Sequence, residues 1–255
     1  MSEDPIAALR ASYDRLAAIV AGLTPGQETA PAYPSEWSIA QVLSHIGSGA
    51  EIMAQAFDAA LRGTPAPGRE TYPAIWDRWN AKAPRDQVRD GIESDRQLVA
   101  RFEALDADQR ARLRFSSFAG EVDTDRFAGL RLNEHAVHTW DVAVVLDPTA
   151  TIGPEAVGLV VDNLAMVAGF SGKAEGLSGR VVQVTTTDPD REFTLRFDSA
   201  VSLQPGRAAD ATAELALPAE AFIRLVYGRL DPAHTPAVTV TGVALDDLRR
   251  AFPGF

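Results

Sequence analysis

Glu134 and His138 are four residues apart in the segment RLNEHAVHTWD, a spacing that suits two ligands of one metal ion. On an α-helix, residues four apart project from one face with Cβ atoms about 5 to 6 Å apart. Carboxylate and neutral imidazole are both good zinc ligands. A catalytic zinc site typically has three protein ligands and one open position. A third ligand must therefore come from elsewhere in the chain.

His45 is our candidate for the third ligand. The chain has four histidines, and this one lies on a predicted amphipathic helix, near the apolar positions that would face a helical bundle. Simpler interpretations exist: E-x-x-x-H pairs are common on exposed helix surfaces, and a buried histidine can simply bond a backbone carbonyl. His135 points about 100° away from the Glu134 and His138 face, so we expect it to be exposed or to support the ligands from behind. Asp141 could orient a ligand imidazole.

The elements that would position these residues are helices. Apolar residues recur at three- and four-residue spacing up to about residue 168, which predicts four or five packed helices. The expected helices cover 5–23, a segment starting after Trp37, 85–105 and 126–146, with another near Pro154. Ser38 and Gln41 form an S-x-x-Q capping box at the start of the second helix.

Beyond Gly179 the pattern changes to short runs rich in Val and Thr, separated by turn residues. These runs predict strands, and two amphipathic stretches among them predict helices. The Gly- and Ser-rich segment GFSGKAEGLSG would link the two parts. We therefore expect a mixed fold with two domains: a metal-binding helical bundle over 1–170 and a small α+β domain over 171–255.

Composition excludes several classes of protein. The chain lacks cysteine, so it can supply neither a disulfide nor a thiol nucleophile of its own. A net charge of −11, with no basic cluster, argues against nucleic acid or an anionic membrane as partner. No signal sequence or membrane-length apolar run is evident, and we expect a cytoplasmic protein.

Two segments resemble a known family. YPSEWSIAQVLSHIGSG and RLNEHAVHTWDVAVVL are similar to the W-[ST]-x-x-x-x-x-x-H-[IL] and R-x-x-E-x-x-x-H-x-W-D segments of the mycothiol-dependent maleylpyruvate isomerases, which are DinB-like up-down bundles. The resemblance implies zinc on His45, Glu134 and His138. The stretches ADATAELALPAEAFIRLVYGRLDP and VTVTGVALDDLRRAF resemble the sterol-carrier-like (SCP2-like) domain that accompanies this bundle.

The resemblance also implies a chemistry. An open zinc position would lower the pKa of mycothiol, a low-molecular-weight thiol, and so supply the thiolate that a cysteine-free protein lacks. In the isomerase reaction the thiolate adds to the cis double bond of maleylpyruvate, rotation follows, and elimination leaves fumarylpyruvate. A dianionic substrate needs cationic partners. Arg229 is the first candidate and Arg131 the second, and an ordinary surface arginine is the alternative for each.

The sequence thus favours a zinc- and mycothiol-dependent enzyme that acts on a small electrophilic or anionic molecule. It would be either a cis-trans isomerase or a mycothiol S-transferase. The alternative is a non-catalytic, metal-stabilised binding protein with a small-ligand pocket, and a weaker one is a protein whose ligand set no longer binds an ion. Three protein ligands would favour catalysis, whereas a closed set of four would favour a structural ion.

Overall fold

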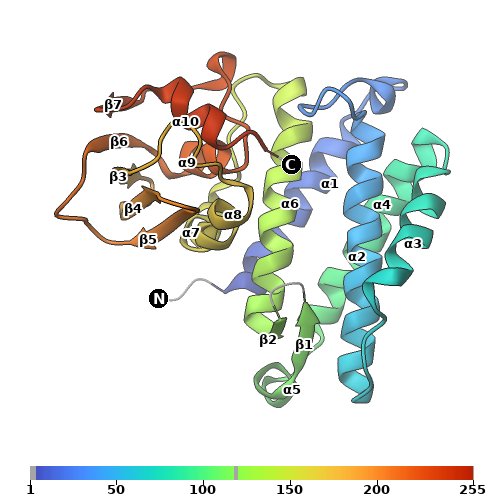
Figure 1. Cartoon of the computed structure of the whole chain (residues 1–255). Helices are drawn as coiled ribbons and strands as arrows, with labels where there is room; N and C mark the ends of the chain where they lie inside the picture. Colours follow the sequence, from blue (N-terminus) through green and yellow to red (C-terminus); the bar gives the residue numbers. More distant parts are fainter. Residues whose placement is uncertain (1–3, 118–119, 255) are drawn as a thin grey trace. The chain divides into compact units, whose positions relative to one another are not determined.

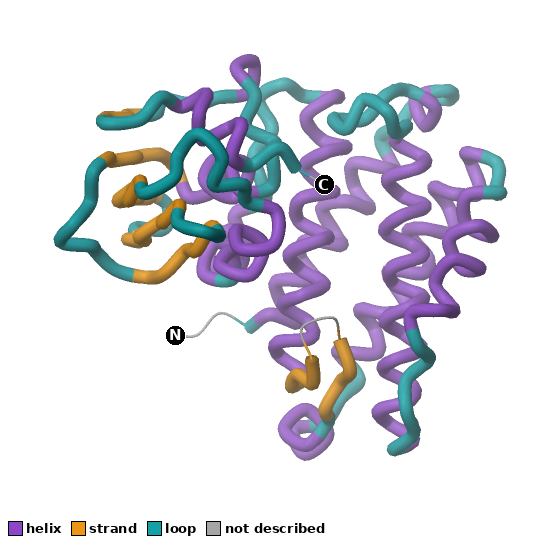
Figure 2. The backbone as a smooth tube through the Cα atoms, viewed as in Figure 1, coloured by secondary structure: helices purple, strands orange, loops and turns teal. Residues whose placement is uncertain are grey.

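The computed structural model describes residues 4–117 and 120–254. The chain divides into two compact units, Met1–Ala156 and Val157–Phe255, which are described separately. The helical elements of the first unit and the sheet of the second can be followed in Figures 1 and 2.

Four long helices of the first unit contact one another in a closed ring. Helix α1 (Pro5–Ala21) contacts α6 (Thr124–Leu146), α6 contacts α2 (Ile39–Arg62), α2 contacts α4 (Pro84–Glu103), and α4 contacts α1. All four agree with the predicted helices to within a few residues. The expected metal ligands lie on α2 and α6, and these two helices are in contact.

The starts of α2 and α6 are fixed by side-chain caps. Ser38 accepts a hydrogen bond from the backbone N–H of Gln41, whose side chain accepts one from the Ser38 N–H in return. The predicted capping box is therefore confirmed. Asp123 caps α6 through the N–H of Arg126. Both caps satisfy backbone donors that a helix leaves free at its first turn.

Several short elements of the first unit escaped prediction. They are the helices α3 (Tyr72–Asn80) and α5 (Ala107–Arg112), the single turns η1 (Gln27–Thr29) and η2 (Arg69–Thr71), and the antiparallel strands β1 (Arg114–Ser117) and β2 (Gly120–Asp123). Phe115 of β1 stacks on Phe127, with ring centroids 4.4 Å apart, and also meets Phe57. The hairpin therefore closes one end of the bundle core with aromatic packing.

The second unit contains a five-stranded sheet in the order β5-β4-β3-β6-β7. The strands are β3 (Arg180–Thr187), β4 (Arg191–Phe197), β5 (Val201–Pro205), β6 (Ala213–Pro218) and β7 (Thr239–Thr241). Strand β6 was not predicted. It pairs in parallel with β3, whereas the other pairings are antiparallel. Ala213, Leu215 and Leu217 are buried in alternation along this strand. The apolar residues at every second position are the sequence signal that indicates it.

Helices of the second unit are α8 (Leu164–Ser171), α9 (Ala219–Val226) and α10 (Leu245–Ala251), with the turn η3 (Pro232–His234) between the last two. Helix α7 (Pro154–Asp162) begins at the end of the first unit. The sequence placed the domain boundary at 170/171, whereas the compact units divide at 156/157. The difference arises because α8 packs on β5, and therefore belongs with the sheet.

A helical unit followed by an α+β unit is the mixed fold class that the sequence predicts, and that prediction is confirmed. Among the helices described, none combines the length and apolar character required to cross a membrane.

Candidate metal centre

Three predicted ligands converge in the first unit. His45 projects from α2, and Glu134 and His138 project from α6, one turn apart. Their ligand atoms all lie within 4.8 Å of one another. Residues separated by about ninety positions in sequence thus meet at the contact between these two helices.

The distances suit one small cation. Nε2 of His45 is 3.4 Å, and Nε2 of His138 3.7 Å, from Oε2 of Glu134. Two donors on a tetrahedral zinc at about 2.0 to 2.1 Å would be about 3.3 Å apart, close to both values. The donor set therefore fits a divalent metal, and the described residues supply three ligands rather than a closed set of four.

Asp141 holds one ligand ring in place. Its fully buried carboxylate lies 2.9 Å from Nδ1 of His138. That contact fixes the ring orientation and turns Nε2 toward Glu134 and His45. Carboxylates behind metal-bound imidazoles commonly play this part, which the sequence suggested for Asp141.

The pKa values in the cluster follow from burial and the neighbouring charges. Although 38% of the His45 side chain is exposed, burial of the rest lowers its pKa below 6.5 and favours the neutral, metal-binding ring. Burial would raise the pKa of Glu134, but His138 and His45 hold it well below 4.5. Burial would lower the pKa of His138, but Asp141 and Glu134 raise it to about 9. The surroundings of His138 thus favour a positive charge, whether a proton or a metal cation.

An indole forms one wall of the cluster. Trp37 is 37% exposed, and its ring lies nearly parallel to His138, with centroids 6.4 Å apart. The same indole lies 5.4 Å from the His45 ring. It therefore limits the directions from which a ligand can reach the two imidazoles.

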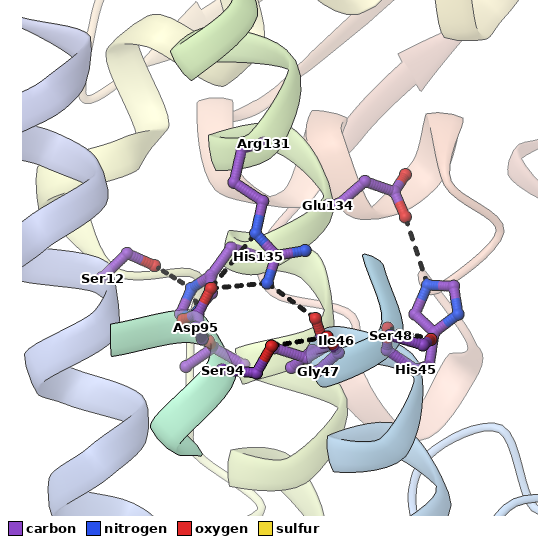
Figure 3. A network of polar contacts seen from close by, with 11 residues as sticks. Ser12, His45, Ile46, Gly47, Ser48, Ser94, Asp95, Arg131, Glu134 and His135 are labelled. Atoms are coloured by element: carbon purple, nitrogen blue, oxygen red, sulfur yellow. Dashed lines mark hydrogen bonds and ion pairs between the residues drawn. The ribbon is translucent and has the colours of Figure 1, made fainter. Parts of the chain in front are cut away.

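A network of buried polar groups lies behind the cluster (Figure 3). The Oδ1 atom of Asp95 accepts hydrogen bonds from Nε and Nη2 of Arg131, at 3.2 and 2.5 Å. Its Oδ2 atom is 2.8 Å from Nε2 of His135, whose Nδ1 contacts Ser12 at 2.8 Å. The possibility that His135 is exposed was wrong: it points into the bundle and is fully buried.

Sequence reasoning missed Asp95. It lies in the strongly charged stretch GIESDRQ of α4, where apolar periodicity does not distinguish a buried carboxylate from its exposed neighbours. The predicted arginines have different surroundings. Arg131 is buried beside the cluster, whereas Arg229 lies in the second unit, where its Nη1 donates to the Tyr227 carbonyl at 2.7 Å.

The chain matches two family models. Residues 9–143 match "Mycothiol maleylpyruvate isomerase N-terminal domain", and this match covers more than half of the chain. The chain belongs to this family. Residues 169–237 match the "SCP-2 sterol transfer family". The predicted resemblance is confirmed in both units, and family membership supports an enzyme of the mycothiol-dependent isomerase or thiol-transferase class.

Two curated proteins and two solved structures are similar to this chain. Two uncharacterized Mycobacterium tuberculosis proteins, MT0763 of strain CDC 1551 and Rv0738 of strain H37Rv, are each 26% identical over 66% of this chain and 80% of their own length. Crystal structures of the mycothiol-dependent maleylpyruvate isomerase and of a histidine-to-alanine mutant superpose with a TM-score of 0.68. They cover 94% of this chain and 92% of theirs, at 14% and 12% identity. These structures support the fold.

Proposed function

We propose that this protein is a zinc-dependent enzyme that uses mycothiol as nucleophile. It would act either as a cis-trans isomerase on a maleylpyruvate-type acid or as an S-transferase on another electrophile. The observation that carries the proposal is the convergence of His45, Glu134 and His138 within 4.8 Å in a chain of this family. A metal held there would polarise a coordinated thiol and lower its pKa.

The chain's own residues prepare the site. Asp141 orients His138 through Nδ1, and Glu134 supplies the negative ligand between the two imidazoles. Trp37 covers one side of the rings. A three-ligand set with an open fourth position favours catalysis over the alternative of a purely structural metal.

The isomerase reaction needs no co-reactant beyond the thiol. The thiolate electron pair forms a C–S bond with one alkene carbon, and the π pair moves to the conjugated carbonyl oxygen as an enolate. After rotation about the resulting single bond, the enolate pair restores the alkene and expels the thiolate. In the transferase reaction the enolate takes a proton and the sulfur stays in the product.

Cationic groups would hold the acid. Arg131 lies beside the ligand cluster and remains a proposed substrate contact. Arg229 of the second unit remains proposed as well. The partners would be one small thiol and one small electrophile, and the cytoplasmic location stays a prediction from the sequence.

Metal content and thiol reactivity test the proposal together. Protein purified without chelator should contain about one zinc per chain, and His45→Ala should lose most of it. The zinc-loaded protein should also shift the pH dependence of mycothiol alkylation to lower pH. His234→Ala is the matched control, because His234 contacts Asp231 in a turn of the second unit.

Two results would overturn the proposal. One is equal metal content in the parent protein and in His45→Ala. The other is an unchanged alkylation profile of mycothiol in the presence of the fully loaded protein. Sulfur retained in the product would identify a transferase, and its release would identify an isomerase.

A further inference from the structure

The two helices that carry the ligand cluster share little direct packing. Helix α2 packs most extensively against α4, and α6 packs most extensively against α1, whereas the contact between α2 and α6 is much smaller. The spacing between His45 on α2 and Glu134 on α6 therefore depends on groups that join the two helices by way of their neighbours.

His45 has no supporting group behind its ring. Among the described side chains, Glu134 is the one at hydrogen-bonding distance from a ring nitrogen of His45. The rings of Trp37 and His138 are its other close neighbours. His138, in contrast, is oriented by Asp141. The position of the His45 ring is therefore set by where the backbone of α2 lies.

Arg131 joins α6 to that backbone. Its Nη2 atom donates to the carbonyl oxygen of Ile46 at 2.9 Å, and Ile46 follows His45 directly in α2. Arg131 itself lies about one turn before Glu134 on α6. A guanidinium group is planar and offers several donors in fixed directions, so it can hold two partners at a defined distance from each other.

Asp95 on α4 fixes the direction of this guanidinium group. Its Oδ1 atom accepts hydrogen bonds from Nε and Nη2 of Arg131, at 3.2 and 2.5 Å. Its Oδ2 atom lies 2.8 Å from Nε2 of His135, the residue after Glu134. One carboxylate thus contacts α6 both before and after Glu134 in the chain (Figure 3).

The preceding residue of α4 holds α2 at the same level. Oγ of Ser94 donates to the carbonyl oxygen of Gly47 at 2.9 Å, one residue along α2 from the carbonyl that Arg131 contacts (Figure 3). Helix α4 therefore holds α2 directly through Ser94, and holds α6 through Asp95.

Stability alone does not explain an ion pair at this place. Asp95 and Arg131 are 0% and 3% exposed. The loss of hydration offsets much of the attraction between two buried charges, and apolar side chains of similar volume often stabilise a core equally well. Directional contacts to both ligand helices are what this pair supplies and an apolar pair would not.

We infer that Arg131 and Asp95 are positioning residues that set the spacing of α2 and α6 at the ligand cluster. Arg131 holds the α2 backbone beside His45, and Asp95 holds both Arg131 and His135. That this spacing serves a divalent metal rests on the proposed function. The role is separate from the substrate contact proposed for Arg131, which concerns a cavity of about 280 Å³ beside His45.

Two variants remove these contacts without changing the summed charge of the pair. Arg131→Lys keeps the positive charge, but its single ammonium group lacks the planar fork that reaches both Asp95 and the Ile46 carbonyl. Asp95→Leu combined with Arg131→Met replaces both charges by apolar side chains. Chelator competition should give a zinc Kd about tenfold or more weaker in both variants. A purely electrostatic effect of the pair on the metal predicts the parent Kd for Arg131→Lys.

Phe102→Leu is the matched control. Phe102 lies on α4, about two turns beyond Asp95, and contacts Phe57 of α2 with ring centroids 5.2 Å apart. The substitution loosens the apolar packing of α4 on α2 and leaves the polar contacts in place, so this variant should bind zinc with the parent Kd. Circular dichroism confirms that each variant is folded before its Kd is measured.

Spin labels measure the helix spacing without a metal. The chain lacks cysteine, so Leu61→Cys on α2 and Val145→Cys on α6, two exposed positions, accept a single pair of nitroxide labels. Pulsed electron paramagnetic resonance of the metal-free protein should give a broader or shifted distance distribution for Arg131→Lys than for the labelled parent. The distribution for Phe102→Leu should equal that of the parent.

Three results would each refute the inference. They are the parent zinc Kd in Arg131→Lys, an unchanged distance distribution in that variant, and an equal loss of zinc affinity in Phe102→Leu. A changed distance distribution, together with a parent protein that binds no zinc, would refute the proposed function alone. Thiol activation by the zinc-loaded parent, together with the parent Kd in Arg131→Lys, would refute this inference alone.

Discussion

Replacing Asp95 by Asn should destabilise the helical unit severely. The substitution keeps the shape of the side chain and its Oδ1 acceptor, but it removes the negative charge that compensates the buried Arg131 guanidinium. Both members of the pair are almost completely buried, at 0% and 3% exposure. Breaking such a pair from one side typically costs about 3 to 5 kcal/mol. That is a large part of the 5 to 15 kcal/mol by which a domain is usually stable.

Tryptophan fluorescence can follow this loss in the first unit alone, because all four tryptophans of the chain lie there: Trp37, Trp76, Trp79 and Trp140. Urea titrations should show a lower midpoint for Asp95→Asn with an unchanged slope. Arg131→Met should also be destabilised. The double variant should lose at least about 2 kcal/mol less than the sum of the two single losses.

The reasoning fails if Asp95→Asn costs less than about 1 kcal/mol, or if the two losses simply add. Either result would mean that water or another group already compensates the Arg131 charge.

Three further predictions concern the same unit. Asp141→Asn should lower metal affinity about 10- to 100-fold, because the carboxylate behind the His138 ring becomes a neutral amide. Chelator competition measures the affinity, and an unchanged value would contradict this prediction. Burial would raise the pKa of Asp95, but Arg131 and His135 hold it below its ordinary 3.8. Its contribution to stability is therefore complete above about pH 4 and is lost as the pH falls further, and the parent's unfolding free energy should drop there more steeply than that of Asp95→Asn. Gly91→Ala should cost about 1 to 3 kcal/mol in urea unfolding, since its Cβ would lie 2.5 Å from the Leu43 carbonyl oxygen; a midpoint equal to that of the parent would contradict close α2–α4 packing.

The sequence predicted what local signals encode. Each of these signals involves residues only a few positions apart. They are the capping box at Ser38, the apolar period of the long helices, and the i,i+4 spacing of Glu134 and His138. The partnership with His45 was inferred from its predicted helix face and supported by the family resemblance. The structure brings its ring to α6, through a helix–helix contact that no local pattern specifies.

Non-local features were harder to predict. In the sequence, Asp95 does not differ from the other charged residues of α4. Its burial depends on the ion pair with Arg131 of α6, which no local pattern specifies. Strand β6 pairs with β3 across two intervening strands, so its partner cannot be found from nearby residues. The cavity beside His45 depends on η2 and α3, which follow a Gly- and Pro-rich segment that was interpreted entirely as a loop.

Helix α6 performs two tasks on different sides of one short stretch. Glu134 and His138 face the ligand cluster, while Arg131 and His135 reach the buried carboxylate of α4. Each residue added to a helix rotates everything beyond it by about 100°. A single codon inserted or deleted between Glu134 and His135 would therefore separate the members of both pairs at once. This stretch should diverge among descendants by amino-acid replacement, with length changes confined to the segments that flank the helix.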